Sequence, residues 1–188
     1  PAIDWIRKNI PMKRLLCLLT LGLLAGCQSA SLPPLTTVPQ VDLERFMGDW
    51  YVIAHIPTWP ERNAWNAIES YALNPDGTIA TTFTFREGGF DGELKTMTPT
   101  GFVTDTQSNA IWGMQFLWPF KADFRISYLT PDYGLTVISR ERRDYVWVMA
   151  RSPEIPETER QAVEEHLKAS GYDLAELRYV PQRWEAKP

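Results

Sequence analysis

The sequence predicts an all-β fold, an eight-stranded antiparallel up-and-down β-barrel with one C-terminal α-helix packed outside it. Short runs rich in β-branched and aromatic residues recur between residues 48 and 151, and turn signals separate them. Short connections make neighbouring strands antiparallel. One helical pattern follows the last run. A barrel fits because ring closure removes exposed sheet edges and leaves room for one small ligand; a β-sandwich is the alternative.

The N-terminal residues predict a lipoprotein signal peptide. Residues 12–26 carry a basic pair, an apolar run too short for a comfortable membrane span, and small residues just before Cys27. Leu24–Cys27 resembles the bacterial lipobox, in which the cysteine is acylated and begins the mature chain. An ordinary secretory signal or a short buried helix is the alternative. Residues 1–11 lack the character of a signal, so we expect a mis-assigned leader, with Met12 as the start.

The residues after this cysteine predict an anchored domain. The residue after Cys27 is Gln28 and not an aspartate. In bacterial lipoproteins, the absence of an aspartate at this position usually means that the protein is sorted to the outer membrane. We therefore expect a lipid-anchored protein that faces the periplasm. Residues 27–40 are rich in Ser, Pro and Thr and predict a tether without packed structure. The barrel domain with its helix is expected over residues 41–184.

Composition and charge argue against several classes of protein. The 188 residues suffice for one domain with a sizeable core. Cys17 leaves with the signal and Cys27 carries lipid, so no disulfide, thiol nucleophile or cysteine metal site remains, and we expect no metal and no cofactor. Residues 1–26 hold four of the 19 basic and one of the 23 acidic residues, which leaves a mature charge of −7. An acidic body argues against a nucleic-acid partner.

Turn signals divide the domain into its predicted elements. Asn74–Gly77 marks a tight turn between two strands. The helix is predicted over residues 157–170, with Pro156 near its first turn and Gly171 where a left-handed cap belongs. A short ninth strand follows over residues 177–180. The eight strands of the barrel are predicted over residues 48–56, 67–73, 78–85, 94–104, 110–116, 123–129, 135–140 and 145–151.

The alternation of side chains along the strands predicts an apolar interior. In residues 110–116 the large apolar side chains share one face, as they do in residues 123–129. Residues 145–151 are apolar on both faces, and we expect the aromatic set inside and the smaller set under the helix. The predicted ligand-binding residues are Tyr71, Phe83, Trp112, Met114, Phe116, Ile126, Tyr128, Val137, Ser139, Tyr145, Trp147 and Met149. A solid core is the alternative; polar groups among the apolar ones favour a pocket.

The connectivity assigns residues to the two ends of the barrel. An alternating meander brings Gly48, Trp50, the turn at Tyr133, and Arg151 to one end, the floor. Arg151 has the parity to cover the Trp50 ring in a cation–π contact of about 0.5–2 kcal/mol.

The longer loops gather at the other end, the mouth. They carry exposed aromatic residues, which suit a lid, a membrane contact or a dimer surface. They also carry cations suited to a carboxylate or phosphate head group. The predicted mouth residues are Trp59, Trp65, Trp118, Phe120, Arg142 and Arg143, with Phe90, Arg62, Arg86 and Lys121 nearby. A solvated set of loops with scattered charges is the alternative.

Three motifs resemble the conserved regions of the lipocalins in order and spacing. They are Gly48-x-Trp50-Tyr51, Thr130–Tyr133, and Arg151 before Ser152-Pro153. With the lipobox, the chain is similar to the bacterial lipocalins, which are outer-membrane lipoproteins. The resemblance implies a calyx for fatty acids or lysophospholipids, a possible homodimer, and a role in lipid storage, transport or membrane repair.

The expected function is therefore binding of a lipid by a membrane-anchored protein without enzymatic activity. A lipid-modifying enzyme is one alternative, but His55 and His166 have no obvious serine or cysteine partner in the sequence. Glu69 and Tyr71 share a face and form a second candidate acid–base pair. A lipoprotein with a filled barrel that acts through protein contacts is the third possibility.

Overall fold

The computed structural model describes residues 32–184. The predicted signal peptide and the lipidation site Cys27 lie outside these residues. All of the described helices and strands belong to one compact unit, which begins at Pro34. Within the described part of the chain, no helix is long and apolar enough to cross a membrane.

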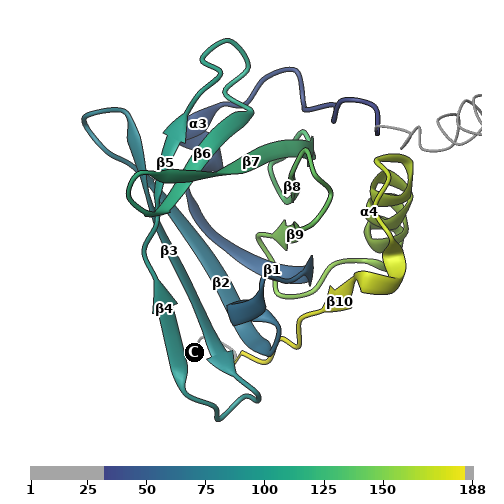
Figure 1. Cartoon of the computed structure of the whole chain (residues 1–188). Helices are drawn as coiled ribbons and strands as arrows, with labels where there is room; N and C mark the ends of the chain where they lie inside the picture. The colour runs from purple at the N-terminus through teal and green to yellow at the C-terminus, as the bar shows by residue number, and fades with distance from the viewer. Residues whose placement is uncertain (1–31, 185–188) are drawn as a thin grey trace, which may run out of the picture. The chain divides into compact units, whose positions relative to one another are not determined.

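The strands form one antiparallel sheet that closes on itself (Figure 1). Its path runs β1-β2-β3-β5-β6-β7-β8-β9, and pairing of β1 with β9 completes the ring. The strands are β1 (Gly48–Ile56), β2 (Ala64–Leu73), β3 (Thr78–Glu87), β4 (Leu94–Met97), β5 (Thr100–Val103), β6 (Ile111–Leu117), β7 (Phe120–Leu129), β8 (Leu135–Ser139), β9 (Val146–Ala150) and β10 (Arg178–Tyr179). The predicted eight-stranded barrel is confirmed.

One predicted strand is interrupted in the structure. Residues 94–104 form two short strands, β4 and β5, which pair with successive parts of β3. Pro99 lies between them and has no N–H to donate to a ladder, so pairing breaks there. The hairpin of β6 and β7 differs in the opposite way: Leu117 pairs with Phe120, so the predicted loop 117–122 is mostly strand.

The helix α4 (Glu157–Ala169) packs outside the barrel, beside β8 and β9 in Figure 1. Its first turn is acidic and its last turn holds His166 and Lys168, the arrangement favoured by the helix dipole. Val163 and Leu167 are buried among the valines of β8 and β9. Gly171, with φ of 89°, follows the helix end as predicted.

The C-terminal segment fills a gap in the ring. Near the floor β1 pairs with β2, but near the mouth β1 pairs with β10 instead. The Gln182 side-chain amide donates hydrogen bonds to the carbonyl oxygens of Val52, at 2.8 Å, and Ala67, at 3.2 Å. The backbone of this segment also bonds to both strands, since the Val180 N–H donates to the Ile53 carbonyl and the Asn66 N–H donates to the Pro181 carbonyl, each at 2.9 Å, so the segment joins β1 and β2 where they no longer pair directly. The short strand predicted over residues 177–180 is confirmed, and a 3-10 turn, η2 (Leu174–Glu176), precedes it.

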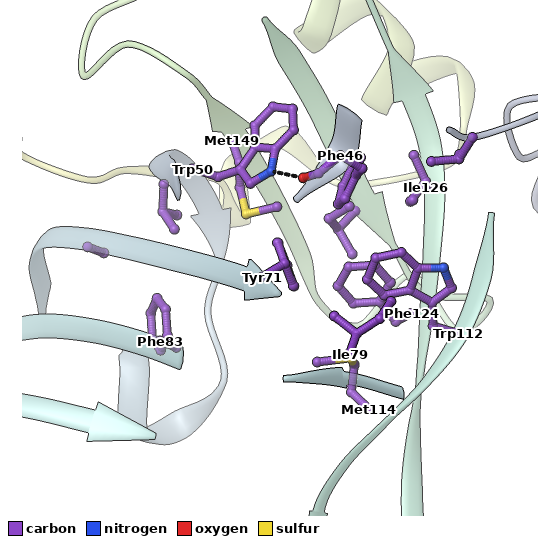
Figure 2. Close-up of a cluster of buried hydrophobic side chains, with 14 of the residues drawn as sticks. Phe46, Trp50, Tyr71, Ile79, Phe83, Trp112, Met114, Phe124, Ile126 and Met149 are labelled. Carbon is purple, nitrogen blue, oxygen red and sulfur yellow. Dashed lines mark hydrogen bonds between the residues drawn. The ribbon is translucent and has the colours of Figure 1, made fainter. Parts of the chain in front are cut away.

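An aromatic cluster fills the floor half of the barrel (Figure 2). A short helix, α3 (Leu43–Phe46), which was not predicted, inserts Phe46 beside Trp50, whose indole Nε1 donates to the Phe46 carbonyl at 2.9 Å. The rings of Trp112 and Phe124 stack with centroids 4.8 Å apart. Aromatic pairs add about 0.5–1.5 kcal/mol each beyond burial. This half of the barrel is solid.

Part of the predicted tether packs on the barrel. The Leu35 side chain is buried, and its backbone N–H donates to the Glu141 carboxylate at 3.2 Å. The Val38 N–H donates to the Ile126 carbonyl at 3.0 Å. The prediction of a segment without packed structure is wrong for these residues, because two apolar side chains in a proline-rich stretch carry no periodicity that would reveal their burial.

Candidate ligand-binding site

A small hollow of about 70 Å³ lies above the aromatic floor. Apolar side chains from β3, β6, β7 and β9 form most of its wall. Phe116 borders it and is nevertheless 59% exposed, so the hollow opens to solvent beside β6. Its lining residues are Thr58, Glu61, Glu69, Phe83, Met114, Phe116, Ala122, Asp123, Phe124, Arg140 and Trp147.

A larger hollow of about 330 Å³ lies nearer the mouth. It is bounded by the 3-10 turn η1 (Trp59–Glu61) and by the β3–β4 hairpin. Its lining residues are Trp59, Pro60, Arg62, Asn63, Phe85, Glu87, Lys95, Thr96 and Met97. Segment 58–63 contributes to both hollows, so this segment stands between them. Pockets that hold drug-sized ligands enclose about 300–1,000 Å³, and the outer hollow falls in that range.

The carboxyl group of Glu61 is held inside the barrel. Its residue is 4% exposed. The Thr58 hydroxyl donates to its Oε1 at 2.6 Å, and the Trp147 indole Nε1 donates to its Oε2 at 2.8 Å. Burial raises the pKa of Glu61 above its ordinary value, and the two hydrogen bonds oppose that shift. The sequence analysis missed this residue because it lies in a loop, where strand parity says nothing.

Glu69 is a second acid in the same hollow. It faces inward because it pairs with Trp50 on one side and Phe83 on the other, and directly opposed residues share a face. Burial among apolar side chains raises the pKa of Glu69 to about 8, and the nearby Glu61 charge contributes in the same direction. Burial also raises the pKa of Tyr71, which lies next to Glu69 on this face.

A β-bulge turns His55 into the barrel. The register of β1 shifts between Val52 and Ala54, after which His55 pairs with the inward-facing Trp147. Strand alternation from Trp50 would turn His55 outward, and the bulge reverses this by shifting the end of β1 out of phase with Trp50. Burial, with a contribution from the Arg178 charge, lowers the pKa of His55 to about 4, so the ring is neutral at pH 7.

The twelve predicted ligand-binding residues fall into three groups. Phe83, Met114, Phe116 and Trp147 line the small hollow. A second group, Tyr71, Trp112, Ile126 and Met149, faces inward but belongs to the packed floor. The solid-core alternative therefore describes the floor half, and the pocket describes the mouth half.

The third group does not face the interior as predicted. Val137 is buried under α4, and Ser139 is hydrogen-bonded on that same outer side. Both faces of β8 are apolar, so alternation could not choose between them; pairing of Val137 with Val148 of β9 fixes the choice. Tyr128 also turns outward, and its ring lies 5.3 Å from that of His166. A bulge in β7 between Ile126 and Tyr128 causes this reversal.

Tyr145 precedes β9 and lies over Arg140. The Arg140 guanidinium is 5.1 Å from the ring centroid, and the same cation pairs with Asp144 at 3.5 Å. Tyr145 is not among the residues that border either hollow. Its ring lies 6.4 Å from that of Trp147, which does line the small hollow, so a place for Tyr145 in the lining stays a prediction.

The predicted floor contacts are present. The Arg151 guanidinium lies 3.7 Å from the Trp50 ring centroid. It also donates to the carbonyl of Asp49 at 2.7 Å and to three carbonyls of residues 45–47 at 2.8–3.0 Å. Tyr133, with φ of 64°, accepts a hydrogen bond on its hydroxyl from the Asp42 N–H. Gly48, with φ of 96°, lies 3.4 Å from Arg151 at its would-be Cβ position, so a side chain there would crowd the guanidinium.

The mouth residues do not form one cluster. Trp59, Trp118 and Phe120 are exposed as predicted, at 73%, 80% and 73%. Trp65 pairs with the outward-facing Arg86 and packs edge-on against Phe90. It therefore lies on the outer wall, because the register shift that follows it in β2 separates its phase from that of the inward residues.

The mouth cations are largely engaged elsewhere. The Arg143 side chain is 5% exposed and donates to carbonyls of Ser170 and Glu141, so its predicted role toward a head group is wrong. Arg142 is exposed and lies 3.6 Å from Asp144. Lys121 lies 3.4 Å from the Phe102 ring centroid. Within residues 32–184, no group of three or more His, Cys, Asp or Glu side chains could hold a metal ion.

His166 has a serine partner that the sequence did not reveal. Its Nε2 lies 3.0 Å from the Ser127 hydroxyl, which is 2.7 Å from the Ser139 hydroxyl. The pair lies between β7 and α4, and neither residue borders a hollow described above. Burial lowers the pKa of His166. This arrangement satisfies polar groups that are buried between the barrel and the helix.

Comparisons with known proteins agree with this architecture. A model of the lipocalin-like domain matches residues 41–182. Temperature-induced lipocalin-1 of Arabidopsis thaliana is 30% identical over 155 residues, which cover 77% of this chain and 81% of that protein. The outer membrane lipoprotein Blc of Citrobacter freundii is 26% identical over 164 residues, covering 85% and 90%. The solved structure of insecticyanin from Manduca sexta, at 15% identity, superposes with a TM-score of 0.63 over 79% of this chain and 84% of that one. The chain belongs to the lipocalin family.

Proposed function

We propose that the protein is a membrane-anchored carrier that holds the apolar chain of a single-chain lipid, such as a fatty acid or a lysophospholipid, in the mouth half of its barrel. The observation that carries this proposal is the pair of hollows above a solid floor, with Phe83, Phe85 and Met97 on their walls. Burying an alkyl chain there contributes about 25 cal/mol per Å² of apolar surface. Storage or transport of lipids during envelope maintenance is the expected role.

The site does not favour an enzyme. Ser127 and His166 lie outside the barrel, and Glu61 and Glu69 have no nucleophilic serine or cysteine among the residues that line the hollow. Members of the lipocalin family are typically binding proteins. Outer-membrane anchoring through Cys27 is part of the proposal and is supported by the lipobox and by the names of the Blc relatives.

A neutral fluorescent ligand tests the proposal. We expect N-phenyl-1-naphthylamine to bind the protein saturably and to be displaced by a lysophospholipid. Ala122→Phe should weaken binding at least tenfold, because Ala122 lines the small hollow and a ring there would occupy it. Ala80→Phe is the matched control, since Ala80 is exposed on β3. Absence of saturable binding, or equal binding by both variants, contradicts the proposal.

A further inference from the structure

Two carboxyl groups border the small hollow without a basic side chain beside them. Glu61 reaches it from η1 and Glu69 from β2. Among residues 32–184, the one ion-pair contact of either acid within 4.0 Å is with His55, whose Nδ1 lies 4.0 Å from Glu61 Oε2. Because burial keeps His55 neutral at pH 7, it supplies no positive charge to either acid.

The cation on the wall of the small hollow already has an anionic partner. Arg140 pairs with Asp144 at 3.5 Å, and the remaining acid of that wall, Asp123, pairs with Arg125 at 2.9 Å. In the outer hollow, Lys95 lies 2.8 Å from Glu93 and 3.5 Å from Glu87. The uncompensated ionisable groups that border the small hollow are therefore both acidic.

Unsatisfied polar atoms lie beside the two acids. His55 is 2% exposed, and its Nδ1, which faces Glu61, has no hydrogen-bond partner. Tyr71 is 3% exposed, and its hydroxyl lies near Glu69 without a hydrogen bond of normal geometry. Buried polar atoms are normally hydrogen-bonded, and leaving one unsatisfied costs about 1–3 kcal/mol. Both atoms lie beside the acids that border the small hollow, although neither His55 nor Tyr71 lines the hollow itself.

We propose that the small hollow recognises lipids through a protonated amine, which donates hydrogen bonds to Glu61 and Glu69 while the attached chain packs against Phe83 and Phe116. This inference rests on the proposed lipid-binding function and narrows the ligand class. Without a cation beside it, the Glu69 carboxyl has a pKa of about 8 and holds its proton at pH 7. A bound ammonium ion favours release of that proton to solvent and then pairs with the carboxylate, whereas the carboxylate of a free fatty acid would bring no positive charge to either acid. The 70 Å³ hollow has room for the amine and the first carbons of the chain, and the rest extends toward the mouth.

A set of ligands with the same chain tests the inference. Decylamine, decanol and decanoate are each titrated at pH 7 into the protein with bound N-phenyl-1-naphthylamine, and displacement of this neutral fluorophore gives the affinity of each ligand. We expect decylamine to bind most tightly and decanoate at least tenfold more weakly. Comparing lysophosphatidylethanolamine with lysophosphatidylglycerol of the same acyl chain identifies the source of the amine: preference for the first assigns it to a phospholipid head group, and equal affinity assigns it to a simple long-chain amine.

Variants of the acids separate recognition from folding. Glu69→Gln should weaken decylamine binding about tenfold and leave decanol unchanged; Glu61→Gln provides a second test if the first variant fails to fold. Glu165→Gln, an exposed position on α4, is the matched control. Decanoate binding as tightly as decylamine overturns the amine inference alone. Failure of all three ligands to displace the fluorophore, or failure of the fluorophore to bind, overturns the lipid-binding function itself.

Discussion

Single residues close one end of this barrel and place buried ionisable groups toward the other. At the floor, one guanidinium serves four backbone carbonyls and covers an indole ring, so a single side chain ties α3 to β1 and β9. At the mouth, two acids and a neutral histidine sit among apolar groups. The first arrangement stabilises the fold; the second lowers stability at neutral pH and leaves chemistry for a ligand.

Arg151→Met should lower the free energy of unfolding by about 3 kcal/mol. Hydrogen bonds to a charged group contribute about 1.5–3 kcal/mol each, but the contributions of one side chain are not additive. Arg151→Lys should recover little, because an ammonium group cannot reach four carbonyls and the ring in the same geometry. Urea unfolding measures the difference. Arg142→Lys, at a side chain 80% exposed, serves as control; equal effects of the variants at 142 and 151 would contradict this account.

Glu69 should make stability depend on pH. Its pKa in the folded protein is about 8, above the ordinary value of 4.5, so the folded state binds more protons between these values. The free energy of unfolding therefore falls as pH rises from about 4.5 to 8, by at most about 1.4 kcal/mol per pH unit. Glu69→Gln should remove this slope and be more stable than the unmodified protein at pH 8, where the unmodified protein has lost most of the stability that the Glu69 proton contributes at low pH.

The comparison isolates Glu69 because other titrating groups are common to both proteins. His55, with its pKa lowered to about 4, affects stability as pH falls below about 6.5, equally in each. Chemical denaturation at pH 5.5, 6.5, 7.5 and 8.5 gives the slope. A pH slope in Glu69→Gln equal to that of the unmodified protein would show that Glu69 is ionised in the folded state at neutral pH.

At the scale of elements, short irregularities decide which side chains face the interior of the barrel. The bulge in β1 turns His55 inward, and the bulge in β7 turns Tyr128 outward. Bulges of this kind recur at barrel rims and beside binding sites. The β6–β7 hairpin is a further case, because its tip extends past the hollow and exposes Leu117, Trp118 and Phe120.

The tip of this hairpin should enter a lipid bilayer. Three large apolar side chains exposed together are unusual for a soluble surface, and Trp is favoured at membrane interfaces. The protein domain should therefore sediment with lipid vesicles. The double variant Trp118→Asp/Phe120→Asp, which places two negative charges at the tip, should weaken this binding at least tenfold. Leu73→Asp, at an exposed leucine at the end of β2, is the control. Unchanged sedimentation of the double variant would remove the hairpin from the membrane contact.

At the scale of the whole molecule, the barrel has a solid half at the floor and a hollow half at the mouth. The C-terminal segment bridges the gap between β1 and β2 in the hollow half. β1 and β2 pair over four residue pairs near the floor, and Gln182 bridges them nearer the mouth. β1 and β2 are therefore held together by different contacts in the two halves of the barrel.

Gln182→Leu should open the ring at this point. Two buried carbonyl oxygens, of Val52 and Ala67, would lose a donor, at a cost of about 1–2 kcal/mol in unfolding free energy. Hydrogen exchange should rise in the mouth half of β2 and remain slow at Trp50 near the floor. Gln161→Leu, on the exposed face of α4, is the control. A uniform rise in exchange along β2 would instead show that the ring opens as one unit.

The sequence by itself determined the barrel, its strand order, the outer helix and the Arg151–Trp50 floor contact, because alternation, turn residues and short loops are local properties. Strand boundaries differed where a proline or a tight hairpin intervened, as at Pro99 and at Leu117 with Phe120. The inward-facing side chains of β6 could be predicted from alternation, because the side chains on one face of that strand are clearly larger and more apolar than those on the other.

Only the tertiary structure decided which residues border the hollow. Parity is carried along a strand until a bulge shifts it, and no pattern in the sequence marked the bulges beside Ile53 and Ser127. Where both faces of a strand are apolar, as in β8, pairing with the next strand determines which side chains point into the barrel. Glu61 enters from a turn, and Glu69 faces a hollow that exists because Phe46 fills the floor and not the mouth. The volume of the cavity inside a closed barrel is determined by how side chains from distant parts of the sequence pack together, so it cannot be predicted from local sequence patterns.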